Sequence, residues 1–143
     1  MRRRIILLRH GHADDGARDF DRVLSPAGQD AARQAGLNLA RAGSLPELVL
    51  ASSAPRALLT AELAASAAGY SGRIQAERAL YLASDSQYLG ALRRLPARVG
   101  SVWLVGHNPG LSALARELCG QADALAPAAY ASVELELGDW AEL

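Results

Sequence analysis

The stretch Ile5-Ile6-Leu7-Leu8-Arg9-His10-Gly11 contains the two features that decide the fold. Ile5 to Leu8 form an unbroken apolar run with two β-branched residues, which is typical of a strand buried on both faces. The run ends abruptly in Arg9 and His10, so polar side chains follow the carboxyl end of this strand. We therefore predict a buried strand that leads directly into a functional loop.

Two further apolar runs end in the same way. Leu48 to Leu50 precede the small polar residues Ser52 and Ser53, and Ser101 to Val105 precede Gly106-His107-Asn108. In open α/β sheets, ligands bind beyond the carboxyl ends of the strands. Three segments that are far apart in the sequence are therefore expected to meet at one edge of a sheet.

Helix signals separate these strands. Ser25 and Pro26 predict an N-cap and a first helical residue, and Gly43 predicts the C-terminal cap of that helix. Pro55 begins a second helix that Gly69 closes. In this second helix Leu59 and Leu63 lie four residues apart on one face, and Arg56 falls in the first turn.

The second half of the chain continues the alternation. We predict a strand over 73–77, a short helix over 86–95, a helix from Pro109 to Gly120, and a final strand that includes Val133 to Leu137. Strands that alternate with helices indicate an α/β protein, with helices covering both faces of a mostly parallel central sheet. The expectation is a three-layer α/β/α sandwich that forms a single domain over residues 1–143.

The composition limits the functions that are possible. The chain has 143 residues, with 15 Lys+Arg and 15 Asp+Glu, and this balance argues against nucleic acid as a partner. No run approaches the roughly 20 apolar residues that span a bilayer, and the four that follow Arg2–Arg4 are too few for a signal peptide. We therefore expect a cytoplasmic protein without a membrane partner. Its one cysteine, Cys119, is expected to be a small buried residue.

Four motifs occur in order along the chain: LLRHGHA (Leu7 to Ala13), LSPAG (Leu24 to Gly28), SSAPRA (Ser52 to Ala57) and VGHNPGL (Val105 to Leu111). Together they resemble the signature of the histidine phosphatase superfamily, the phosphoglycerate mutase-like proteins. The short length, the sequence VGHNP and the lack of insertions are similar to the SixA-type phosphohistidine phosphatases. The resemblance covers nearly the whole chain and implies the phosphoglycerate mutase-like fold.

The resemblance also implies roles for individual residues. His10 would be the nucleophile that forms a covalent phosphohistidine, while Arg9, Arg56 and His107 would hold the phosphoryl oxygens. These residue types suit the chemistry, because a phosphoryl group in transfer carries negative charge on three oxygens, and arginine supplies a planar, permanently charged fork. Gly11 would let the backbone approach the substrate closely.

The general acid is the least defined part of the predicted site. In many members of the family a carboxylate after the third strand has this role, and Asp85 and Glu77 are the candidates here. Asp85 is preferred because the segment ASDS lies in a predicted loop. The resemblance to SixA implies less dependence on this acid, since a protonated imidazole leaves more readily than an alkoxide.

No cofactor and no metal are expected. His12 and His10 form a His-x-His pair, but the chain has only three histidines and no matching carboxylate or cysteine cluster. The predicted function is dephosphorylation of phosphohistidine in a signalling or phosphotransfer protein. The alternatives are hydrolysis of small monoesters, such as sugar or nucleotide phosphates, and a non-catalytic phosphate-binding module.

Overall fold

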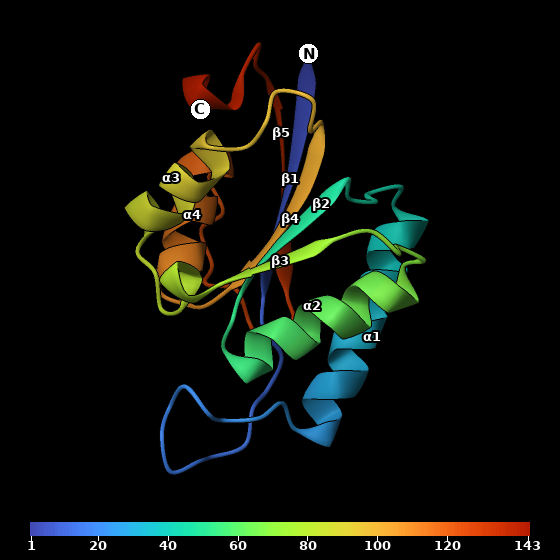
Figure 1. Cartoon of the computed structure of the whole chain (residues 1–143), viewed down its shortest axis with the longest axis vertical. Helices are drawn as coiled ribbons and strands as arrows, with labels where there is room; N and C mark the ends of the chain where they lie inside the picture. Colours follow the sequence, from blue (N-terminus) through green and yellow to red (C-terminus); the bar gives the residue numbers. More distant parts are fainter.

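The computed structural model describes residues 1–143 and has a five-stranded sheet between two pairs of helices (Figure 1). The strand order is β3-β2-β4-β1-β5; the first four are mutually parallel, and β5 is antiparallel to β1. The strands are β1 (Arg2–Arg9), β2 (Leu48–Ser52), β3 (Ile74–Glu77), β4 (Ser101–Gly106) and β5 (Tyr130–Glu136). The helices are α1 (Pro26–Arg41), α2 (Pro55–Ala67), α3 (Asp85–Arg93) and α4 (Gly110–Cys119), with short 3₁₀ turns η1 (Arg78–Leu80) and η2 (Trp140–Glu142). The predicted three-layer α/β/α sandwich with a mostly parallel sheet is confirmed.

Strand β1 explains why its apolar run is continuous. Ile5 and Leu7 belong to the hydrophobic cluster that contains residues of α3 and α4, whereas Ile6 and Leu8 belong to the cluster that contains residues of α1 and α2. Successive side chains of a strand point to opposite faces, so a strand covered by helices on both sides needs apolar residues at every position. All four side chains are buried.

The predicted helix boundaries rest on local chemistry. The Ser25 side chain accepts a hydrogen bond from the Gly28 amide and caps α1, with Pro26 as the first helical residue. Gly43 and Gly69 follow α1 and α2 with φ angles of +71° and +83°, which favour glycine. These turns fix where each helix begins and ends.

Helices α1 and α2 pack through small residues. The buried face of α2 consists of Arg56, Ala57, Thr60, Ala61, Ala64 and Ala65. Leu59 and Leu63 lie only half-buried beside this face. On α1, a Cβ atom added at Gly36 would overlap the carbonyl oxygen of Ala64. The two helix backbones are therefore in direct contact at this point.

Some details differ from expectation. β5 begins at Tyr130, because pairing with β1 already starts at Leu8 opposite Tyr130, and it ends at Glu136, so Leu137 lies outside the strand. Cys119 is exposed, so the expectation of a buried cysteine is wrong; it is the last residue of α4 and lies beyond the apolar stripe of that helix. None of the helices combines the length and the apolar character needed to cross a membrane.

Candidate active site

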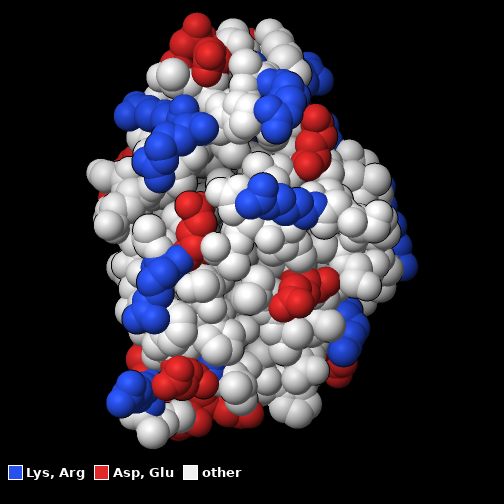
Figure 2. Space-filling model, viewed as in Figure 1, with Lys and Arg blue, Asp and Glu red and all other residues white.

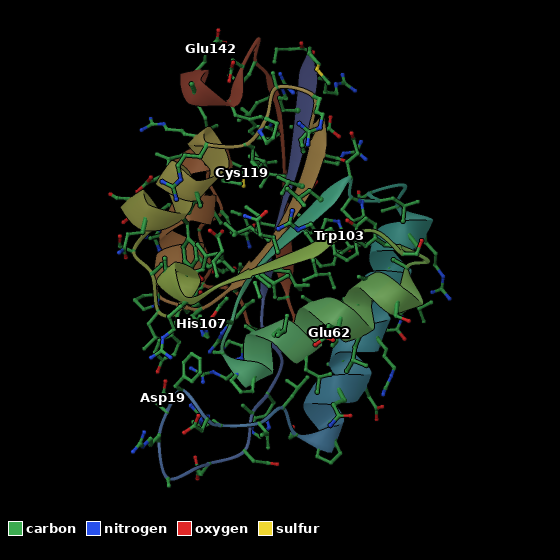
Figure 3. All side chains as sticks on the ribbon, in the orientation of Figure 1. Asp19, Glu62, Trp103, His107, Cys119 and Glu142 are labelled. Carbon is green, nitrogen blue, oxygen red and sulfur yellow. The ribbon has the colours of Figure 1, made fainter.

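The carboxyl ends of three adjacent strands carry the predicted site residues. β4 lies between β1 and β2 in the sheet, with Arg9 opposite Gly106 and Ala51 opposite Val105. His10, Ser52 and His107 therefore emerge side by side. Figure 3 shows His107 and Asp19 at this same end of the molecule, with Asp19 on the loop that connects β1 to α1.

The His10 side chain is held in one tautomer. Its Nδ1 lies 2.7 Å from the Gly11 carbonyl oxygen, which can only accept a hydrogen bond, so we assign the proton to Nδ1. Nε2 is then unprotonated, and its lone pair accepts a hydrogen bond from the Arg56 Nε at 3.4 Å. The backbone amide of His10 donates to the Gly106 carbonyl and fixes the loop to β4. This arrangement leaves Nε2 as the nucleophilic atom.

The pKa of His10 is lowered from 6.5 to about 4, and burial is the main cause. The hydrogen bond to the Gly11 carbonyl opposes this shift, while the positive charges of Arg56, Arg9 and Arg22 contribute to it. The imidazole is therefore neutral at pH 7, as a nucleophile must be.

His107 lies against His10, with ring centroids 5.1 Å apart. Its Nε2 is 2.8 Å from the Ser52 hydroxyl, and its backbone amide donates to the Tyr88 hydroxyl. Because His107 Nε2 is the one acceptor within reach of the Ser52 hydroxyl hydrogen, we assign that hydrogen to the contact with Nε2, which leaves the imidazole proton on Nδ1. Burial, together with the charges of His10 and Arg56, lowers the pKa of His107 to about 3.

These two shifted pKa values predict that the protein loses stability as the pH falls. An unfolded histidine gains a proton near pH 6.5, whereas folded His10 stays neutral down to about pH 4. Between these values the unfolded chain binds more protons, so the free energy of unfolding decreases as the pH falls from about 6.5 to about 4. The shift at His10 corresponds to a loss on the order of 3 kcal/mol. We expect Tm to fall less steeply in His10→Ala than in the wild type, and parallel Tm curves would contradict the assignment.

Arg56 is fully enclosed at the start of α2, with only 2% of its surface exposed. Its NH1 donates to the Asp19 carbonyl oxygen at 2.7 Å, and its NH2 to the Asp19 carboxylate at 3.0 Å. Its own carbonyl accepts from Thr60 Oγ1, which in turn accepts the Gly11 amide proton. The guanidinium is thus fixed on one side by Asp19, while its Nε points at His10.

Two buried polar atoms have no hydrogen-bond partner: Arg9 Nε and His107 Nδ1. Both belong to residues that line the same pocket. Arg9 is otherwise held by a hydrogen bond from NH1 to the Leu125 carbonyl oxygen. Unsatisfied buried groups are uncommon in proteins, and here both are donors. The pocket is therefore prepared for a ligand that supplies acceptor oxygens.

The pocket has a volume of about 230 Å³. Its lining consists of Arg9, His10, Gly11, His12, Ala13, Asp19, Arg22, Arg56, Leu82, His107, Asn108 and Pro127. Asp19 is the single carboxylate in this set, and it is not among the site residues predicted from the sequence. It is one of four aspartates in the loop between β1 and α1, and no local signal separates it from the others. Its role depends on Arg56 and Tyr81, which lie far along the chain.

Gly11 and His12 both line this pocket, with different neighbours. A Cβ atom at Gly11 would lie 2.8 Å from the Gly28 carbonyl oxygen. The close neighbour that requires a glycine there is therefore the start of α1. His12 contacts the Ser25 hydroxyl through Nδ1 at 2.9 Å.

The structure does not bring the two expected acids to this pocket. Asp85 is the first residue of α3 and lines a separate depression together with Leu82 and Pro109. Glu77 ends β3 and lines a groove between β3 and α3. Neither carboxylate belongs to the lining of the pocket that contains His10.

The groove beside Glu77 is the largest cavity, about 570 Å³, but its lining contains no histidine. Figure 2 shows it as a hollow in the upper part of the face, with basic and acidic side chains around it. The largest cavity is therefore not the one that contains His10 and His107, and the smaller pocket is the candidate active site. No group of three or more His, Cys, Asp or Glu side chains is arranged to hold a metal ion.

Comparison with known proteins defines the class. The family model of the histidine phosphatase superfamily (branch 1) matches residues 5–81, and the chain belongs to this superfamily. A search of curated protein sequences gives no match.

Among solved structures, the chain is similar to several SixA proteins. A candidate phosphohistidine phosphatase SixA from Agrobacterium tumefaciens is 30% identical, with a TM-score of 0.83 over 91% of this chain and 90% of that chain. A candidate phosphohistidine phosphatase SixA from Nakamurella multipartitia is 27% identical, with a TM-score of 0.79 over 99% of this chain and 89% of that chain. The protein histidine phosphatase SixA complexed with tungstate is 25% identical, with a TM-score of 0.79 over 95% and 91%. The fold is thus the phosphoglycerate mutase-like fold of the SixA proteins, and these similarities support a phosphatase.

Proposed function

We propose that this chain, acting as one domain over residues 1–143, is a phosphohistidine phosphatase that dephosphorylates a signalling or phosphotransfer protein. One observation carries the choice of substrate. The pocket contains a neutral nucleophile and several cationic donors, but its single carboxylate is held in the ionised form.

Asp19 is ionised because its hydrogen-bond partners all favour the anion. The Tyr81 hydroxyl donates to its carboxylate, and so do Arg56 and Arg22. These hydrogen bonds, that of Tyr81 first, lower the pKa of Asp19 to about 2. A carboxylate with this pKa has no proton to give to a leaving group near neutral pH.

The nature of the leaving group then separates the possible substrates. An alkyl phosphate ester expels an alkoxide, which requires a proton from a general acid. Phosphohistidine that is protonated on its other ring nitrogen expels a neutral imidazole, and transfer to His10 exchanges one nitrogen–phosphorus bond for another of the same kind. A pocket without a protonated acid therefore favours phosphohistidine over alkyl esters.

The proposed reaction has two steps. His10 Nε2 attacks phosphorus, and the bond from phosphorus to the substrate imidazole breaks. Because the other ring nitrogen of that imidazole carries a proton, the ring departs as neutral imidazole and needs no proton from the enzyme. Water then attacks the phosphorylated His10, releases phosphate and restores the neutral imidazole. In both steps the negative charge on the phosphoryl oxygens meets Arg9 Nε, His107 Nδ1 and the N–H groups of Arg56 that Asp19 does not occupy. The SixA protein solved with tungstate, a tetrahedral oxyanion, supports an oxyanion as the ligand of such a pocket.

Substrates that differ in their leaving groups test this proposal. We expect kcat/KM for phosphoimidazole and for a histidine-phosphorylated protein to exceed that for serine phosphate by at least about 100-fold, the usual minimum contribution of a general acid. p-Nitrophenyl phosphate, whose leaving group needs no acid, should fall between them. Phosphate release measured under identical conditions gives the comparison.

The Asp19→Asn variant is the matched control. As a positioning residue for Arg56, Asp19 should affect all substrates by a similar factor. A loss confined to serine phosphate would instead identify Asp19 as a general acid. Comparable rates for serine phosphate and phosphoimidazole in the wild type would favour a phosphatase of small monoesters.

A further inference from the structure

Leu82, which joins η1 to α3, is unfavourably placed in two respects. Its side chain is 52% exposed and belongs to neither hydrophobic cluster. Its backbone has a φ angle of +48°, in the left-handed region that favours glycine. Neither packing nor backbone conformation therefore explains why a leucine occupies this position.

Ala128 is the one other non-glycine residue with a positive φ angle, and hydrogen bonds explain its backbone conformation. Its amide donates to the carbonyl oxygens of Arg9 and His10, which ties its loop to the end of β1. The backbone N–H and C=O of Leu82 make no hydrogen bond within the chain. Unusual backbone conformations without such a reason occur preferentially at functional sites.

The position of Leu82 relative to the catalytic pocket suggests that function. Leu82 lines the pocket of His10 and also a second depression of about 370 Å³, which includes Ala83, Pro109 and Ala113. The preceding residue, Tyr81, contacts the His107 ring edge-on at 5.4 Å and holds Asp19. The Leu82 side chain is thus an exposed apolar element between the site of phosphoryl transfer and an adjoining hollow.

We propose that Leu82 is a docking residue for the protein that carries the phosphohistidine. When the phosphoryl group enters the pocket, Leu82 packs against apolar surface beside the phosphorylated histidine, and the adjoining depression receives a neighbouring side chain of the same protein. Asp85 lines that depression and would repel a second phosphate, so the depression suits an apolar or cationic side chain. A small phosphoramidate has no group that reaches it.

This inference rests on the proposed function, and two substrates separate them. The first is a phosphotransfer protein phosphorylated on histidine with phosphoramidate, and the second is phosphoimidazole. For Leu82→Ala we expect the ratio of kcat/KM for the protein to kcat/KM for phosphoimidazole to fall about five- to tenfold, as for an apolar contact at an interface. The change should appear in KM for the protein rather than in kcat.

Leu45→Ala is the matched control, because Leu45 is also half exposed (50%) and precedes β2, at the far end of the strands from the pocket. It should leave the ratio unchanged. Leu82→Gly adds a readout that a structural role would not give. Its Tm should equal or exceed that of the wild type, because glycine adopts positive φ freely, while the substrate ratio falls as in Leu82→Ala.

An unchanged ratio in Leu82→Ala, or equal losses on both substrates, would overturn the docking role and leave the proposed function standing. A lower Tm in Leu82→Gly would also overturn it, by showing that the leucine stabilises the fold. Wild-type enzyme that hydrolyses serine phosphate but neither phosphohistidine substrate would overturn the proposed function and the docking role together.

Discussion

His10→Ala is expected to abolish turnover and to leave the fold intact. The variant lacks the atom that attacks phosphorus, and we expect kcat/KM to fall by at least about a thousandfold. The fold should survive because His10 follows β1 and contributes to neither hydrophobic cluster. Phosphate release and thermal unfolding of the same preparation measure both effects.

A covalent label makes this expectation more specific. Wild-type enzyme mixed with a ³²P-labelled phosphohistidine substrate and quenched in alkali should retain label on His10, because the nitrogen–phosphorus bond survives alkali. His12→Ala is the control, since it removes a neighbouring imidazole that contacts Ser25 and should still become labelled. Label retained by His10→Ala, or substantial phosphatase activity in it, would remove His10 as the nucleophile.

Arg56→Lys is expected to reduce kcat/KM by at least about tenfold, and Arg56→Ala by more. Lysine keeps the charge but loses the planar fork, which here faces Asp19 with two nitrogens and His10 with the third. Fixed donors aimed at a developing charge typically contribute about 2.7–4 kcal/mol each, so the alanine variant should lose about 100- to 1000-fold.

Arg33→Lys on α1 provides the comparison for Arg56→Lys. Arg33 pairs with Asp30 on the helix surface, and its replacement should leave kcat/KM and Tm unchanged. The comparison shows whether the loss depends on the fork at the pocket. Near-normal kinetics for both Arg56 variants would show that Arg56 makes no contact with the phosphoryl group.

Much of the fold could be predicted because its determinants are local. The apolar run of β1 shows that both faces are covered, and Ser25, Gly43 and Gly69 mark helix ends through their own backbone and side-chain chemistry. Parallel strands place their carboxyl ends at one edge, so the sequence also predicts that His10 and His107 come together. No pairwise contact needs to be known for this inference.

The parts that the sequence did not predict depend on contacts between distant segments. Asp19 acquires its role only when the loop before α1 reaches Arg56 and Tyr81, 37 and 62 residues further along. Asp85 was predicted to lie in a loop, but the residues around it carry a helix signal. Ser84 and Gln87 form a capping box, so the segment ASDSQ begins a helix. An aspartate in a first turn is favoured by the helix dipole, without any catalytic role.

The contact between Gly36 and Ala64 affects the position of α2, the helix that carries Arg56. Ala64 lies eight residues after Arg56 on the same rigid helix, which is about 12 Å along its axis. A side chain at position 36 would push α2 away from α1 and would displace the helix that carries Arg56. The helix that carries the most deeply buried cation of the pocket is thus positioned in part by two small residues that do not line the pocket.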